Sequence, residues 1–210
     1  AFFLTNGTSS GVQAMIMSAC QAGDKVILPR NAHKSAINAL ILGGITPVYV
    51  QPEMNTRLGI AMGVTVEKIK EAIALHPDAK AVFLINPTYY GAASALKEIT
   101  ELCHKHDMAV LVDEAHGAHF GFSKYFPENS VHLGADIVIH SLHKTLPSYT
   151  QTALIHINGK LVDRQKVRMF LQMYQTSSPS YILMAGIDEC IRYVEEQGTD
   201  AFDKFAERLD

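Results

Sequence analysis

The stretch that decides the fold reads Ala109-Val110-Leu111-Val112, followed at once by Asp113-Glu114-Ala115-His116. A short, continuous apolar run rich in valine is typical of a strand that is buried on both faces. Further runs along the chain share this character, and they are Lys25–Leu28, Thr46–Val50, Ala81–Ile85, Ile137–His140 and Ala153–Ile157. The sequence therefore predicts a sheet made of several short buried strands.

Amphipathic stretches separate these strands and place apolar residues at helical spacing. They are Ser9–Gln21, Lys34–Leu42, Val66–Leu75 and Leu96–His106. This alternation predicts an α/β fold of three layers, with helices on both faces of a mostly parallel sheet. After Ile157 the pattern is helical only: we expect helices over Leu161–Tyr174, Ile182–Glu196 and Phe202–Asp210, with Pro179 in the first turn of the second.

Composition narrows the class of protein. The chain has 210 residues, of which 48% are hydrophobic and 19% charged, as in a soluble globular protein. A net charge of −3 gives no indication of a basic surface that would bind nucleic acid. No apolar run approaches the roughly 18 residues that a membrane span needs. The three cysteines are odd in number and widely spaced, so we expect buried thiols in a cytoplasmic protein and no disulfide framework.

Chemistry-bearing residues follow two of the predicted strands. Asp113 ends one strand, and Ser141-Leu142-His143-Lys144 follows the next. Ligands of open α/β sheets bind beyond the carboxyl ends of the strands, so both groups could reach one pocket. Upstream, Asn6-Gly7-Thr8-Ser9 precedes a helix and offers hydroxyl and amide groups to a phosphate. A phosphate site, an acid and a lysine together suit pyridoxal 5′-phosphate (PLP), which needs all three.

Several of these residues also have simpler interpretations. Lys144 could be a surface lysine, and Lys34 is a rival for the reactive amine. Asp113, His33, Thr8 and Ser9 could cap helices. The remaining side chains could serve packing alone: Tyr89, Tyr90, His116 and His119.

Two other motifs are weaker. Asp113-Glu114-Ala115-His116 spells the DEAH box of helicases, but the glycine-rich loop with its lysine, which an ATPase of that class requires, is missing from the sequence. His116 and His119 have a spacing that could suit a metal, yet no third ligand is placed convincingly. We therefore expect no metal site.

Five motifs in register carry a family resemblance. They are Asn6-Gly7-Thr8-Ser9, Arg30-Asn31-Ala32-His33-Lys34-Ser35, Asn86-Pro87-Thr88-Tyr89-Tyr90-Gly91, Asp113-Glu114-Ala115-His116-Gly117-Ala118-His119 and Ser141-Leu142-His143-Lys144-Thr145. The set resembles the major domain of bacterial ornithine/lysine/arginine decarboxylases, over Leu4 to Tyr181. Members of this family are PLP enzymes of the aspartate-aminotransferase fold (fold type I).

The resemblance implies a role for each matching residue. Lys144 would form the Schiff base with PLP, Asp113 would face the pyridinium nitrogen, and His33 would stack on the ring; these three are the expected catalytic residues. Ala115 would pack on the opposite ring face with His116 close by, although some relatives carry tryptophan at that position. The expected phosphate ligands are Thr8, Ser9, Ser141 and His143, joined by Thr176 in a segment near the dimer interface.

The resemblance also implies a function. It predicts a lyase that decarboxylates arginine, lysine or ornithine to CO2 and a polyamine precursor, in a cytoplasmic homodimer or larger oligomer. Residues 1–180 would form the PLP-binding major domain, truncated at its N-terminus, and residues 181–210 would begin a helical connection to a missing C-terminal domain. The alternatives are an aminotransferase or carbon–sulfur lyase on the same fold, or an inactive cofactor-domain fragment.

Overall fold

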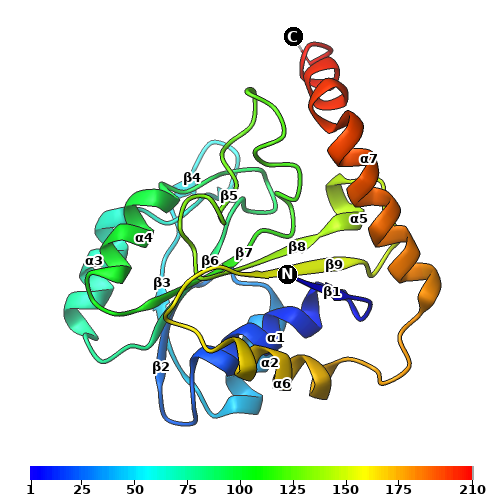
Figure 1. Cartoon of the computed structure of the whole chain (residues 1–210). Helices are drawn as coiled ribbons and strands as arrows, with labels where there is room; N and C mark the ends of the chain where they lie inside the picture. Colours follow the sequence, from blue (N-terminus) through cyan, green and yellow to red (C-terminus); the bar gives the residue numbers. More distant parts are fainter. Residues whose placement is uncertain (210) are drawn as a thin grey trace.

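A mixed seven-stranded sheet forms the centre of the computed structural model, which describes residues 1–209 (Figure 1). Five neighbouring strands run parallel, and the sheet ends in two antiparallel pairings, of β9 with β8 and of β1 with β9. The mostly parallel sheet is thus confirmed. In spatial order the strands are β1 (Phe2–Leu4), β9 (Ala153–Ile157), β8 (Ile137–Ser141), β7 (Ala109–Asp113), β6 (Ala81–Ile85), β2 (Lys25–Pro29) and β3 (Thr46–Val50).

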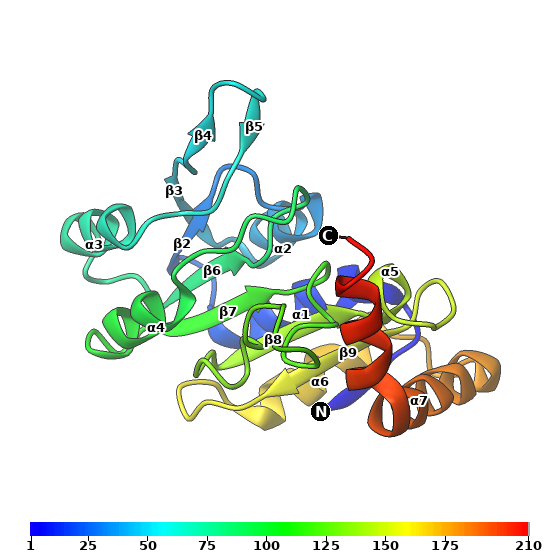
Figure 2. The same ribbon diagram turned by 90° about the horizontal axis from the view of Figure 1, so that it is seen from above.

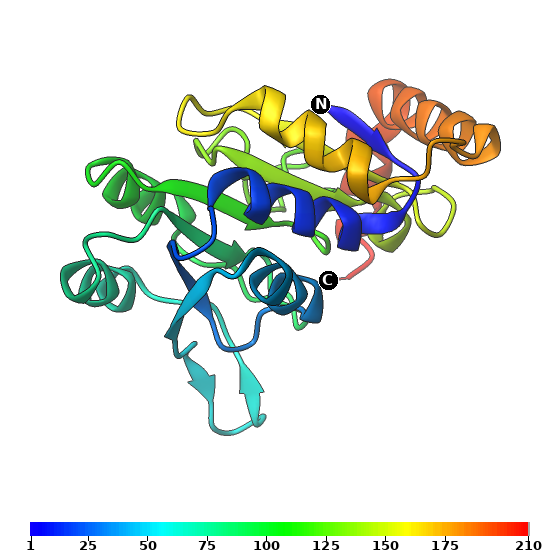
Figure 3. The same ribbon diagram turned by 90° about the horizontal axis from the view of Figure 1, so that it is seen from below.

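Helices cover both faces of the sheet, as the alternating pattern predicts. One face carries α1 (Gly7–Ala19), α2 (Lys34–Gly43) and α6 (Arg164–Tyr174) (Figure 3). The other face carries α3 (Val66–Leu75) and α4 (Leu96–His104). Successive strand residues point to opposite faces, so Leu111 packs in the first apolar core and Val112 in the second. The three-layer α/β/α architecture is confirmed.

Some element boundaries differ from the prediction. Helix α1 begins at Gly7, earlier than Ser9, and α6 begins at Arg164, later than Leu161, because Asp163 accepts the Gln165 N–H at 2.7 Å as its N-cap. The sequence pattern also missed a small hairpin of β4 (Met54–Asn55) and β5 (Ile60–Ala61), which projects from the body of the fold (Figure 2).

The last helix corrects two expectations. Helix α7 (Tyr181–Ala206) is one continuous element, where the sequence predicts two. It passes through Gly198, a residue unfavourable in helices that here is buried, where an added Cβ atom would lie 4.0 Å from Phe122 Cδ1. Pro179 precedes the N-cap Ser180 and so lies outside the helix. The predicted boundary at 180/181 coincides with the start of α7, and a domain beyond it stays a prediction; Asp210 lies outside the described residues.

Residues outside the strands complete the core. Cys20, Cys103 and Cys190 are all buried free thiols. Burial raises the pKa of Cys20 and of Cys103 to about 12, so both are poor nucleophiles. Within residues 1–209, the helices are too short or too polar to cross a membrane.

Helix α1 lies unusually close to the sheet at Gly11. A Cβ atom at this position would collide with Ile139 Cδ1 and would lie 2.6 Å from Leu4 Cδ1. Both neighbours are fully buried, so they have little room to move. The glycine therefore allows the beginning of α1 to approach the ends of β1 and β8.

We expect Gly11→Val to lower the free energy of unfolding by about 1–3 kcal/mol through overpacking. Urea unfolding followed by circular dichroism measures this. Gln13→Val, on the same helix at a half-buried position, is the matched control and should change stability by no more than about 0.5 kcal/mol. Equal effects of the two substitutions would show that helix propensity, and not the close approach, limits this position.

Candidate functional site

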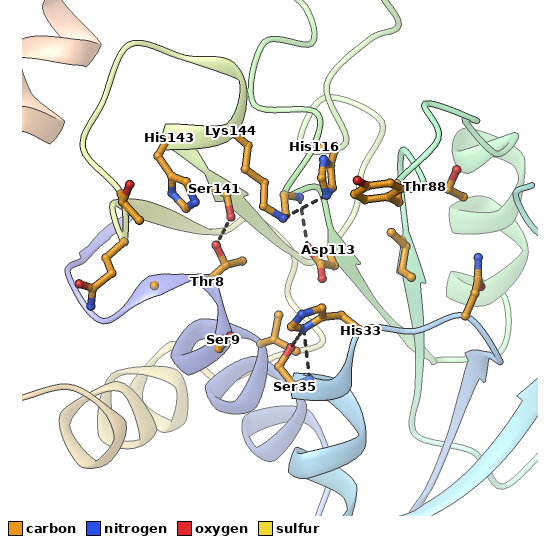
Figure 4. A pocket seen from close by; sticks show the side chains of 18 of the residues that line it. Thr8, Ser9, His33, Ser35, Thr88, Asp113, His116, Ser141, His143 and Lys144 are labelled. Atoms are coloured by element: carbon orange, nitrogen blue, oxygen red, sulfur yellow. Dashed lines mark hydrogen bonds between the residues drawn. The ribbon is translucent and has the colours of Figure 1, made fainter. Parts of the chain in front are cut away.

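A cavity of about 600 Å³ opens at the carboxyl ends of β6, β7 and β8, between the N-termini of α1 and α2 (Figure 4). The last residue of each of these strands lines it: Ile85, Asp113 and Ser141. Strand register brings them together, because Ile85 pairs with Asp113 and Asp113 pairs with Ile139 of β8. The sequence rule that sites lie beyond the carboxyl ends of parallel strands holds here.

Asp113 and Lys144 face this one cavity. The Asp113 side chain is only 5% exposed, and its Oδ1 accepts the Ala115 N–H at 3.1 Å. Burial raises the pKa of Asp113, while that hydrogen bond and the charges of Lys144, His33 and His140 pull the pKa back down. Asp113 thus caps no helix but closes a turn after β7, which orients its carboxylate.

Lys144 lies on the short helix α5 (Leu142–Thr145), just after β8. Its Nζ atom is 3.0 Å from His116 Nε2, so the two side chains form a pair inside the cavity. The rival Lys34 lies at the start of α2 and is absent from the cavity lining in the described part of the chain. Geometry therefore favours Lys144 as the reactive amine.

Hydroxyl groups gather where α1 begins. Thr8 Oγ1 and Ser141 Oγ are hydrogen-bonded to each other, and Ser9 lines the cavity beside them. The N-cap of α1 is Asn6, whose side chain makes no capping hydrogen bond, so Thr8 and Ser9 are not the caps of this helix. A helix N-terminus without a side-chain cap, surrounded by hydroxyls, is suited to an anion.

His143 lies at the same edge of the cavity as these hydroxyls. Its Nδ1 is 3.4 Å from the Thr152 carbonyl oxygen, a contact at the long limit of hydrogen bonding. His143 therefore lines this side of the cavity, and its predicted contact with a phosphate stays a prediction.

His33 has two functions in the structure. It is the N-cap of α2, where its Nδ1 accepts the Ser35 N–H at 3.2 Å and lies 2.8 Å from the Ser35 hydroxyl. The same ring lines the cavity, as do Asp113 and Ala115. Capping orients the imidazole and does not compete with the predicted stacking role.

The two histidines that follow Asp113 separate in the fold. His116 lines the cavity, with its ring 5.5 Å from that of Tyr89 in an edge-to-face arrangement. His119 instead packs among aromatic rings, with centroid distances of 4.7 Å to Phe126 and 5.9 Å to Phe202. The spacing that could suit a metal therefore does not bring both histidines to one point.

Other positions show where sequence reasoning was incomplete. Thr176 is exposed, accepts the Ser178 N–H at 3.2 Å and lies outside the cavity, so its approach to a phosphate across a dimer interface stays a prediction. Cavity residues that the sequence analysis did not assign include Asn31, Thr88, Thr150 and Gln151, together with Tyr89 and Tyr90.

Only some of these omissions had a signal in the sequence. The polar run from Ser148 to Gln151 could have been identified, because it follows Lys144 closely. The position of Gln151 depends on the fold, where its carbonyl accepts the Gly7 N–H at 3.0 Å.

The cavity makes a testable prediction for His116. Burial lowers its pKa below the ordinary 6.5, and the positive charges of Lys144 and His33 lower it further. We expect an NMR titration of the ring to give a midpoint below 6.5 and Lys144→Gln to raise that midpoint. Lys34→Gln is the control and should leave it in place. A midpoint at or above 6.5 in the unsubstituted protein would contradict the geometry.

Comparisons with known proteins identify the family of the chain. The family model described as "Orn/Lys/Arg decarboxylase, major domain" matches residues 1–208. The chain is 43% identical over 199 residues to an arginine decarboxylase of Halalkalibacterium halodurans, covering 95% of this chain and 40% of that protein. This chain thus spans about 40% of the length of the curated arginine decarboxylases that it matches.

Solved structures show the same fold. The crystal structure of the Francisella novicida lysine decarboxylase superposes with a TM-score of 0.84 at 24% identity, covering 97% of this chain and 30% of that one. N-succinyldiaminopimelate aminotransferase from Mycobacterium tuberculosis gives a TM-score of 0.73 at 17% identity, covering 99% and 54% of the two chains. The predicted aspartate-aminotransferase-like fold is thereby confirmed. On the strength of its sequence match over residues 1–208, the chain belongs to the Orn/Lys/Arg decarboxylase family.

Proposed function

We propose that the protein containing this chain is a PLP-dependent decarboxylase of basic amino acids. One observation carries the proposal: the Asp113 carboxylate and the Lys144 amine face a single cavity whose third side is the hydroxyl-lined start of α1. Family membership supports the same reaction. Arginine is the first substrate to test, because the curated relative at 43% identity carries the name arginine decarboxylase.

The residues present fit the cofactor. A flat ring with an acidic partner for its nitrogen, a phosphate arm and an aldehyde needs three different groups at separate points of one cavity. Here Asp113, the Thr8–Ser141 hydroxyl pair and Lys144 are those groups, and His33 and Ala115 offer surfaces for the ring faces. When bound, PLP withdraws electrons from the bond that breaks next to the substrate amine.

Asp113 would hold a proton on the ring nitrogen of the cofactor. This requires a charged carboxylate in a buried place, and burial by itself favours the neutral form. The Ala115 N–H, Lys144 and the nearby histidines offset only part of that cost. Because the net effect raises the pKa of Asp113, the charged form is present above that raised pKa and is lost as the pH falls.

His116 would prepare Lys144 for reaction. A lysine attacks an aldehyde as the neutral amine, so its Nζ must first lose a proton. His116 Nε2 lies 3.0 Å away, and its lowered pKa keeps the imidazole uncharged near neutral pH. The ring can therefore accept a hydrogen bond or a proton from Nζ, and later return a proton to the reaction centre.

Covalent trapping tests the assignment of the lysine. After incubation with PLP and reduction with borohydride, mass spectrometry should find the cofactor attached to Lys144. We expect Lys144→Ala to abolish both the attachment and the visible absorption band, because the amine is gone. Lys34→Ala, the control, should keep both. Cofactor attached to Lys144→Ala at the level of the unsubstituted protein would refute the assignment.

Product analysis tests the reaction. With PLP and arginine, lysine or ornithine in separate assays, we expect release of CO2 and of the matching amine, because decarboxylation leaves the amino group on the product and returns the cofactor as its aldehyde. Agmatine from arginine should be the major product, and Asp113→Asn should slow its formation by at least about a hundredfold. Transfer of the amino group without CO2 would instead indicate an aminotransferase, and attachment of PLP without turnover would indicate a cofactor domain that is inactive by itself.

A further inference from the structure

A buried carboxylate–imidazole pair lies on the sheet face opposite the cavity. Glu114 is 0% exposed and His140 5% exposed, and Glu114 Oε2 is 2.6 Å from His140 Nε2. Glu114 also accepts the Ser130 N–H at 3.2 Å and a hydrogen bond from the Ser130 hydroxyl. Neither Glu114 nor His140 lines the cavity, so the site described above does not account for them.

Strand alternation explains where this pair lies. Asp113 and Glu114 are consecutive, so their side chains point to opposite faces of the sheet. The same holds for His140 and Ser141. The pair therefore connects the ends of β7 and β8 on one face of the sheet, while Asp113 and Ser141, at the same two strand ends, line the cavity on the other. The main chain continues the connection, because the Glu114 N–H donates to the Ile139 carbonyl at 2.9 Å. Lys144 lies on helix α5, which directly follows the strand that carries His140.

The charges around His140 identify Glu114 as its counter-ion. His156 of β9 faces His140 at a ring distance of 4.9 Å, and burial lowers the pKa of His156 to about 3, with a further contribution from His140. His119 also has a lowered pKa, through burial and then His140. Both neighbours are therefore uncharged near neutral pH. The negative groups are Asp113, on the cavity side, and Glu114, in direct contact.

His140 differs from the other positive groups near Asp113. Lys144 and His33 line the cavity, so a bound cofactor would engage both of them. His140 stays behind the sheet in contact with Glu114, whether or not the cavity is filled. The influence of His140 that lowers the pKa of Asp113 thus comes from behind the sheet, where the His140 ring contacts a carboxylate of its own.

We propose that Glu114 and His140 are positioning residues for the cofactor site. Their buried contact holds the ends of β7 and β8 together, so that Asp113 and Lys144 face each other across the cavity, and the Glu114 carboxylate favours a positive charge on His140 behind Asp113. This inference rests on the proposed PLP function. It concerns residues that would touch neither cofactor nor substrate.

Cofactor titration of the Glu114→Gln protein tests the proposal. Glutamine keeps the size and a hydrogen bond but removes the carboxylate that favours a positive charge on His140; because His140 lowers the pKa of Asp113, we expect that pKa to rise further. Below its pKa, each unit of rise lowers the charged fraction of Asp113 about tenfold. We therefore expect PLP binding, followed by its visible band, to weaken by about tenfold or more at about pH 6 and by less at about pH 8, relative to the unsubstituted protein.

A second carboxylate–imidazole pair in the same fold, in which the carboxylate is buried and the imidazole is exposed, provides a control. His104 Nε2 is 2.9 Å from Asp136 Oδ2, Asp136 is 1% exposed, and it also accepts the Val110 N–H at 2.8 Å. Asp136 immediately precedes β8 at the end remote from the cavity. Asp136→Asn should lower the melting temperature as Glu114→Gln does, but it should leave PLP affinity unchanged at both pH values.

The outcomes separate the two proposals. If Glu114→Gln binds PLP with the same pH profile as the unsubstituted protein, or if Asp136→Asn shifts the profile equally, the positioning role is wrong and the PLP function stands. If the unsubstituted protein attaches no cofactor to Lys144, both fail. Should Glu114→Gln not fold, the double variant Glu114→Gln/His140→Gln leaves no unpaired buried charge. It should fold and still lose affinity as the pH falls; unchanged affinity there would overturn the inference.

Discussion

The pairing of β7 with β8 is the constraint on which the rest of the site depends. Asp113 ends β7 and lies level with Ile139 of β8, so the carboxylate and the turn that carries Lys144 leave the sheet side by side. Parallel strands must end at the same edge of the sheet, and both strands are buried along their full length. The rigid core therefore sets the distance between the acid and the amine, and loop conformation has little influence on it.

Electrostatic balance is the second requirement of this arrangement. A carboxylate that is 5% exposed tends to take up a proton, which would remove the charge that a pyridinium partner needs. Groups that lower the pKa of Asp113 lie on both sides of the sheet: Lys144 and His33 toward the cavity, His140 behind it. Of these three, His140 is the one in direct contact with a buried carboxylate, that of Glu114.

Several residues serve structure and site together. His33 caps α2 and presents the same ring to the cavity. Gly11 lets α1 approach the sheet closely, and that approach brings Thr8 within hydrogen-bonding range of Ser141. At His33, one side chain both caps a helix and lines the cavity. For His33, the two interpretations of one sequence position are therefore compatible.

The sequence alone determined the strand order along the chain and the layer architecture, and it singled out Asp113, Lys144, His33 and Thr8, which all line one cavity, because buried strands and motif spacing are local properties of the chain. Tertiary structure alone decided which side chains meet. It separated His116 from His119, placed Thr176 outside the cavity and paired Glu114 with His140 behind the sheet. Contacts between residues distant in sequence depend on register and on the face to which each side chain points, and local patterns do not record which partner lies opposite.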